Sequence, residues 1–172
     1  MMNKFFAILI AAVLALSCTA AFAATYTHED DIRFEYDENA FEITVDDRTD
    51  DETTVVLYGK NEAWGHTFVA FYVRDLKDGE KFPTMEEMSQ MPDTTVTQGE
   101  WNGYKDVFMY TLENDDGTAE SYFIAPVMDK DDKEIEDVLT VHIGTSKIED
   151  EAVLQERDDA ISAVVDSLKV DD

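Results

Sequence analysis

The chain has 172 residues, of which 40 are Asp or Glu and 13 are Lys or Arg, so its formal net charge is −27. A potential this negative repels nucleic-acid phosphates and anionic membrane surfaces, and it attracts cations and basic proteins. Nucleic-acid binding is therefore disfavoured. A simpler explanation of the charge is that acidic residues keep an exported domain soluble.

The first 23 residues have the pattern of a secretory signal peptide. Lys4 precedes an apolar run from Phe5 to Leu16, and Ala21-Phe22-Ala23 is a small-x-small cleavage site. The run is shorter than the roughly 20 residues that a membrane span needs. We expect cleavage after Ala23, leaving one secreted or periplasmic domain over residues 24–172 without a membrane span.

Cys18 offers a competing interpretation of the same segment. A lipoprotein would be anchored through this cysteine, but Ala15 stands where a lipobox has leucine. Cleavage after Ala23 leaves a domain without cysteine, and therefore without a disulfide, a thiol nucleophile or a cysteine metal site. Its stability then depends on a conventional hydrophobic core, for which residues 24–172 are long enough.

Alternating apolar and polar residues predict the first strands. The segments 32–36 and 41–45 alternate on either side of a turn at 37–39, which favours a hairpin with one face on the core. Residues 46–52 form a hydrophilic, acidic loop, and the β-branched run 53–59 predicts a third strand.

The segment 67–74 is apolar on both faces, which is typical of a central strand covered on two sides. A short helix is predicted at 84–91. Thr84 is its expected N-cap, and Glu87 three residues later completes a capping box. Pro92 ends the helix, because the residue before a proline disfavours the helical conformation.

The second half of the chain predicts a long hairpin, a last strand and a last helix. The hairpin arms are 104–112 and 118–128, joined by a tight turn at 114–117, and the strand is 135–143. Residues 149–168 have helical spacing. The apolar stripe of this helix is Val153, Ile161, Val164, Val165 and Leu168.

Tight turns between most of the strands favour an antiparallel sheet, and helices segregated from the strands make the fold class α+β. We expect one largely antiparallel β-sheet of about eight strands, with one short mid-chain helix and one long C-terminal helix packed on the sheet.

This order of elements resembles the PsbP-like family, the PsbP-type α/β/α sandwich that also occurs in DcrB-like small bacterial exported proteins. The resemblance lies in the opening strand pair 32–43, in Gly99-Glu100-Trp101-Asn102-Gly103-Tyr104 before a long hairpin, and in Asp166-Ser167-Leu168-Lys169-Val170 at the end of the last helix. It implies a non-catalytic accessory or binding domain, in some members associated with divalent ions or protein partners. It implies no catalytic residues.

Sequence motifs give an enzyme little support. His28, His66 and His142 lie far apart and lack the spacing of a zinc site. No nucleophile-elbow, phosphate-loop or dinucleotide motif is present. We therefore expect a non-enzymatic protein without a resident cofactor.

Two acidic segments predict weak calcium binding, because hard oxygen ligands concentrate there. Their candidate ligands are Asp46, Asp47, Asp50 and Asp51 in the first segment and Asp129, Asp131, Asp132 and Glu134 in the second. The simpler interpretation is that both segments are solvated acidic loops.

Large aromatic residues in glycine-containing loops are candidate anchors for a partner protein. Trp64 lies beside Gly65, and Trp101 and Tyr104 flank Gly103. The competing interpretation is that each tryptophan plugs one end of the sheet.

Together these patterns predict a secreted, non-enzymatic accessory or protein-binding domain of the bacterial cell envelope, with a basic or envelope protein as its partner. The alternative is a weak calcium-binding exported protein that uses its acidic loops. A hydrolase is the third hypothesis.

Overall fold

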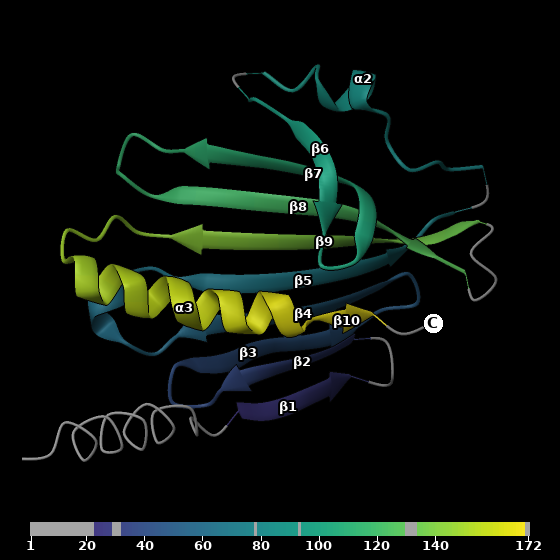
Figure 1. Ribbon diagram of the computed structural model, residues 1–172. Coiled ribbons are helices and arrows are strands. Elements are labelled where there is room, and N and C mark those ends of the chain that lie inside the picture. Colours follow the sequence, from purple (N-terminus) through teal and green to yellow (C-terminus); the bar gives the residue numbers. More distant parts are fainter. Residues whose placement is uncertain (1–22, 29–31, 78, 93, 130–133, 171–172) are drawn as a thin grey trace, which may run out of the picture.

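The computed structural model describes residues 23–28, 32–77, 79–92, 94–129 and 134–170 (Figure 1). The predicted signal peptide and Cys18 lie outside the described residues, apart from Ala23 at the cleavage site. The described chain forms ten strands in two sheets, with two α-helices of which the longer is near the C-terminus. Every strand pair is antiparallel, which confirms a largely antiparallel α+β fold.

The larger sheet has seven strands. In spatial order they are β3 (Phe41–Arg48), β4 (Glu52–Gly59), β5 (Phe68–Asp75), β9 (Ile135–Thr145), β8 (Ala119–Met128), β7 (Tyr104–Glu113) and β6 (Thr97–Trp101). Strands β5 and β9 lie in the interior of this sheet, so the prediction that the apolar segment 67–74 is a central strand is confirmed. The predicted hairpin β7–β8 is also present.

The smaller sheet has three strands in the order β1 (Ala23–His28), β2 (Ile32–Asp37) and β10 (Lys169–Val170). The predicted hairpin of 32–36 with 41–45 is wrong, because β2 pairs with β1 and β10 while β3 pairs with β4. The turn at 38–40 carries the chain from one sheet to the other. The alternation of apolar and polar residues correctly predicts one buried face for each strand. It does not show that the two strands belong to different sheets, whose buried faces meet in the same core.

Helix α3 (Glu151–Ser167) runs across the front of the seven-stranded sheet (Figure 1). It begins at the N-cap Asp150, whose carboxylate accepts hydrogen bonds from the backbone N–H groups of Ala152 and Val153. Helix α3 contacts β2, and the two elements bury one face of the sheet together. The described residues contain no helix with the length and apolarity to cross a membrane.

The core between these layers is a single apolar cluster. Phe34 of β2 lies 5.0 Å from Phe71 of β5, measured between ring centroids, which places the smaller sheet on the same face as α3. The helix contributes Ile161, Val164 and Val165, as its apolar stripe predicts. Burial of such side chains contributes about 1.5–3 kcal/mol each to stability.

A short segment covers part of the opposite face. Helix α2 (Met85–Met88) has the predicted capping box, in which Thr84 and Glu87 each accept a hydrogen bond from the other's backbone N–H. It is shorter than the predicted 84–91. Met88 and Val96 pack with Phe108 of β7 in a small second cluster. A 3-10 helix, η1 (Glu62–Trp64), joins β4 to β5.

Candidate functional site

The face of the seven-stranded sheet opposite α3 is the first candidate site, and we call it the open face. Its side chains form rows across six strands, because paired residues of an antiparallel sheet point to the same side. From β3 to β7 the three rows are Glu42, Tyr58, Phe68, Gly144, Glu120, Leu112; Val45, Val56, Ala70, His142, Tyr122, Tyr110; and Asp47, Thr54, Tyr72, Thr140, Ile124, Phe108.

The middle row contains a stack of three rings on adjacent strands. The ring centroids of Tyr110 and Tyr122 are 4.8 Å apart, and those of Tyr122 and His142 are 4.2 Å apart, with 13° between the ring planes in both pairs. These separations are close to the spacing of about 4.8 Å between neighbouring strands. The rings therefore stand upright on the sheet, with their faces against one another and their edges toward solvent.

Phe68 extends this stack toward β4. Its ring occupies the space in which a Cβ of Gly144 would lie, since that atom would be 2.1 Å from Phe68 Cε1. From there Phe68 meets the ring of His142 edge to face, with centroids 4.8 Å apart and 89° between the planes. Tyr58 lies 5.7 Å from Phe68 on its other side. These five rings cross five strands, from β7 to β4, and we call them the aromatic belt: Tyr110, Tyr122, His142, Phe68 and Tyr58.

Glu120 joins two of the stacked rings through one carboxylate oxygen. Glu120 Oε2 accepts a hydrogen bond of 2.7 Å from the Tyr122 hydroxyl and lies 3.1 Å from His142 Nε2. Because a carboxylate only accepts, the second bond requires a proton on Nε2. The bond from Tyr122 lowers the pKa of Glu120, burial opposes that change, and the contact with His142 lowers the pKa further. Burial and the Glu120 carboxylate raise the pKa of Tyr122.

The open face is negatively charged. Glu42, Asp47 and Glu120 stand in its rows. The guanidinium of Arg74, at the end of β5, is bound by both carboxylate oxygens of Glu80, at 2.7 and 2.9 Å. This pairing lowers the pKa of Glu80 to about 2, so the Arg74 charge is already matched at neutral pH. The carboxylates of Glu42, Asp47 and Glu120 therefore make the electrostatic potential over the aromatic belt negative.

Exposed apolar side chains mark the same face. Among the described residues the exposed large hydrophobic side chains are Val45 and Tyr58, each 39% exposed, and Met85, 37% exposed. Val45 and Tyr58 stand in the rows of the open face, whereas Met85 belongs to α2 and lines a cavity at one end of the sheet. Apolar surface left exposed beside polar groups is typical of interaction sites.

The residues predicted to anchor a partner protein, Trp64, Trp101 and Tyr104, do not stand in the rows of the open face. Trp64 is only 1% exposed and packs against Phe41, with ring centroids 5.7 Å apart, so it is a core residue and offers no surface to a partner. Trp101 is half-buried between Tyr104 and Phe123, at 6.1 and 5.0 Å.

The two tryptophans also belong to opposite ends of α3. The η1 turn with Trp64 contacts the N-terminal half of the helix through the Asn61–Glu156 hydrogen bond. Asn102, next to Trp101, donates to the carbonyls of Val165 and Leu168 at the C-terminal end. The structure therefore does not bring the tryptophans together. Tyr104 lines the cavity to which Met85 belongs.

The acidic segments of the calcium hypothesis are spread over the surface. Asp46 and Asp47 lie in β3 rather than in a loop, and Asp46 Oδ1 lies 2.6 Å from His28 Nδ1. Asp51 pairs with Lys77 at 2.9 Å, and Asp50 is exposed.

In the second acidic segment, Asp129 accepts a hydrogen bond from the backbone N–H of Glu134, while Asp131 and Asp132 lie outside the described residues. Within the described ranges no three His, Cys, Asp or Glu side chains are grouped to hold a metal ion. Calcium binding stays a prediction.

Comparisons with protein-family models, curated proteins and solved structures find no match to this chain. The PsbP-like resemblance stays a prediction, and the function has to be inferred from the chain's own residues. The aromatic belt was not predicted from the sequence, although each of its rings lies in or beside a predicted strand. Finding it requires the register of five strands.

Proposed function

We propose that this protein is a non-enzymatic binding domain of the bacterial cell envelope whose open face docks a basic segment of a partner protein. The observation that carries the proposal is the aromatic belt, which is partly exposed and stands among carboxylates. Tyrosine is enriched at protein interfaces, where its ring supplies contact area and its hydroxyl a hydrogen bond.

Charge complementarity selects a cationic partner. The chain's net charge of −27 attracts basic proteins from a distance, and Glu42, Asp47 and Glu120 meet them at the surface. A second copy of the same chain would carry the same negative charge and be repelled. Lysine and arginine stems pack on apolar surface while their charged ends reach carboxylates. Val45 and Tyr58 are the exposed apolar surface available for that packing.

The ring arrangement disfavours ligands that bind by stacking, such as sugars and nucleobases. Tyr122 has Tyr110 against one face and His142 against the other, so neither face of its ring is free for a ligand. The ring edges, the hydroxyl groups and the neighbouring carboxylates remain. These groups suit hydrogen bonds and ion pairs with a protein segment.

The test is a titration of the isotope-labelled protein, followed by NMR, with a short peptide of alternating arginine and valine. A peptide with glutamate in place of arginine is the control. We expect shifts of backbone resonances in β3, β4, β5, β9 and β8 with the basic peptide only. The affinity should fall steeply as salt shortens the screening length from about 10 Å at 0.1 M to about 3 Å at 1 M.

Matched variants locate the site. Tyr58→Ala should weaken binding of the basic peptide, whereas Met85→Ala, at a similarly exposed apolar residue of α2 outside the aromatic belt, should leave it unchanged. Equal effects of both variants, or shifts spread over all acidic surfaces, would show non-specific attraction and overturn the proposal.

A further inference from the structure

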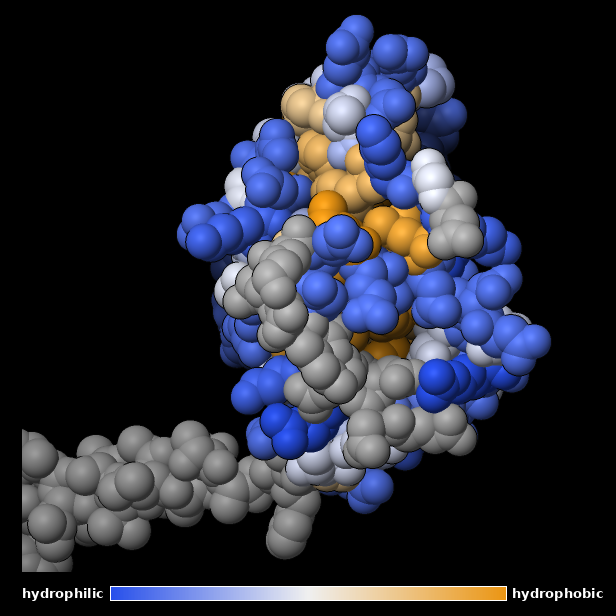
Figure 2. Space-filling view, turned by 90° about the vertical axis from the view of Figure 1, so that its right-hand side faces the viewer, coloured by the Kyte–Doolittle hydropathy of each residue, from blue (hydrophilic) through white to orange (hydrophobic). Residues whose placement is uncertain are grey.

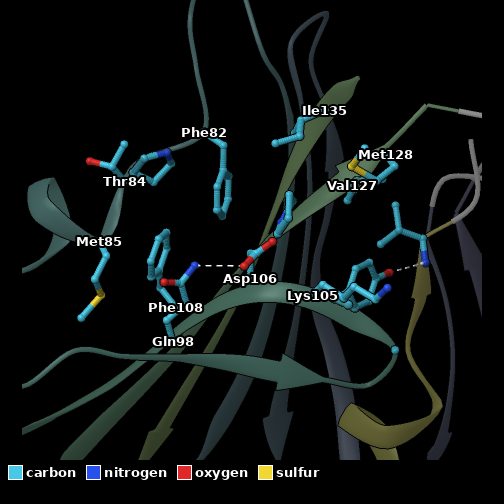
Figure 3. A pocket seen from close by; sticks show the side chains of 15 residues that line it. Phe82, Thr84, Met85, Gln98, Lys105, Asp106, Phe108, Val127, Met128 and Ile135 are labelled. Carbon is cyan, nitrogen blue, oxygen red and sulfur yellow. Dashed lines mark hydrogen bonds between the residues drawn. The ribbon is translucent and has the colours of Figure 1, made fainter. Parts of the chain in front are cut away.

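A second site lies at one end of the seven-stranded sheet, and none of the belt rings lines it. It is a cavity of about 970 Å³, at the upper end of the range typical of small-molecule sites. Figure 2 looks onto the right-hand end of Figure 1 and shows apolar side chains gathered in a region framed by hydrophilic ones. The apolar lining of the cavity includes Phe82, Phe108, Val127, Met128 and Ile135 (Figure 3).

The cavity exists because β7 separates from β8. The two strands pair from Phe108 and Ile124 onward, and the first residues of β7 pair with β6 instead. Pro126 of β8, which has no backbone N–H to donate, lines the cavity beside this separation. Asp106 of β7 has φ of 57°, a left-handed conformation that is uncommon for any residue but glycine.

Asp106 is exposed to solvent and brings a carboxylate beside the apolar side chains of the lining. The Asp106 side chain points into the cavity, in the space below Phe82 in Figure 3. Its Oδ1 accepts a hydrogen bond of 3.2 Å from Gln98 Nε2, which orients the carboxylate and leaves Oδ2 for a ligand. Strained, non-glycine backbone of this kind concentrates at binding sites, where the surrounding structure holds it in place.

The opposite wall is aromatic. The rings of Phe82 and Phe108 are stacked with 5.4 Å between centroids and 11° between planes. Phe82 comes from the segment before α2, and Phe108 is held in the second apolar cluster beside Met88. The partly exposed ring of Phe82, stacked on the buried ring of Phe108, therefore faces the same space as the carboxylate (Figure 3).

We propose that this cavity binds a small amphipathic amine, with its apolar body against Phe82, which the buried Phe108 supports from behind, and its ammonium group on the Asp106 carboxylate. A charge-assisted hydrogen bond of this type is about twice as strong as a neutral one. The negative potential of the whole protein also raises the local concentration of cations. This site adjoins the open face at Phe108 but contains none of the five belt rings, so it does not depend on the docking proposal.

Lys105 lines the same cavity and supplies the competing charge. If its ammonium group controlled recognition, the preferred ligand would be an anion. Three probes with one apolar body separate the possibilities, namely 4-phenylbutylamine, the neutral 4-phenylbutanol and the anionic 4-phenylbutyrate. We expect the amine to bind most tightly by calorimetric titration, with NMR shifts at Phe82, Phe108 and Ile135.

Asp106→Asn is the decisive variant. Asparagine also tolerates the left-handed conformation, and its amide oxygen still accepts from Gln98, so the fold is kept while the charge is removed. Affinity for the amine should fall about tenfold or more, with little change for the alcohol. Asp115→Asn, in the exposed β7–β8 turn, removes the same charge elsewhere and should change neither.

Three results would overturn the proposal. They are tighter binding of the anion, equal binding of all three probes, and an amine affinity that Asp106→Asn leaves unchanged. Phe82→Ala provides an independent check of the apolar wall, and it should weaken all three probes by a similar factor. Tyr58→Ala on the open face should leave the amine affinity as it is.

Discussion

The two faces of strand β5 are both apolar, yet they are built differently. The side chains facing α3 are Val69, Phe71 and Val73, which are buried and carry no polar atoms. The open face has Phe68 and Tyr72, which remain partly exposed, with Ala70 fully buried between them. The first face is closed by other elements of the fold, whereas the second is covered largely by its own aromatic side chains.

This difference shows how an apolar sheet face can shield itself from water where only a short segment covers it. Tyr110, Tyr122 and His142 bury their ring faces against one another and turn polar edges to water. Glu120 satisfies two of those edges with hydrogen bonds. Such a face is stable alone but keeps groups that a partner can bind. The predictions below test whether stability and binding are divided between the two faces in this way.

The largest expected effect is on the closed face. Phe71→Ala should lower the free energy of unfolding by about 3–5 kcal/mol, because it leaves a cavity among Phe34 and the α3 side chains. Tyr72→Ala, the next residue on the opposite face, should cost roughly 1 kcal/mol, the centre of the range for point substitutions. Urea unfolding curves with unchanged slopes would measure both. Equal losses of unfolding free energy would mean that side chains of the open face are packed as tightly as those of the core.

The next effect concerns the contact that holds the end of α3 to the sheet. Asn102 Nδ2 donates to the carbonyls of Leu168 and Val165, at 2.8 and 3.3 Å, and Asn102 itself has φ of 48°. Asn102→Ala should lower the free energy of unfolding by about 1–3 kcal/mol, because it removes both hydrogen bonds to the end of the helix, although the Val165 carbonyl keeps its bond from the Leu168 N–H. Asn102→Gly removes the same bonds but relieves the backbone strain, so it should cost less than alanine. The opposite order would show that strain plays no part.

The open face should account for a pH-dependent part of stability. The pKa of Glu120 is lowered from its usual 4.5, so the folded protein binds this proton more weakly than the unfolded chain. The stabilisation is therefore present above about pH 4.5 and is lost as the pH falls through the lowered value. Glu120→Gln should flatten the acid decline of the unfolding free energy relative to the wild type. Glu100→Gln, at an exposed glutamate of β6, is the matched control and should follow the wild-type decline.

Local chemistry made several elements predictable. The apolar stripe of α3, the capping box of Thr84 and Glu87, the β-branched run of β4 and the tight turn between β7 and β8 each depend on residues close in sequence. Pairing between strands depends on residues far apart. Strand β2 pairs with β10 at the other end of the chain, and no pattern within residues 32–45 distinguishes that arrangement from a local hairpin.

The two candidate sites could not be predicted from the sequence, because they also depend on contacts between residues that are far apart in the chain. Strand β9 lies between β5 and β8, which places His142 between Ala70 and Tyr122, a neighbourhood that sequence order does not suggest. The cavity depends on the positive φ of Asp106 and on the point where β7 leaves β8. Aspartate tolerates that conformation, but it also occupies ordinary positions in strands and loops, so the residue type alone did not indicate the site.

The smallest effect on stability should come from the residue most directly tied to docking. Val45 lies in the middle row, 39% exposed, on the edge strand β3. Val45→Thr keeps the β-branched shape that suits a strand but replaces a methyl group with a hydroxyl, and the unfolding free energy should stay within about 0.5 kcal/mol of the wild type.

The same substitution should nevertheless weaken the basic arginine–valine peptide, because it removes apolar surface on which lysine or arginine stems pack. Unfolding curves and peptide titrations on one protein sample would show both outcomes. A loss of stability without a loss of binding would assign Val45 to the fold. The expected result, binding lost with stability kept, would separate the interaction surface from the core that supports it.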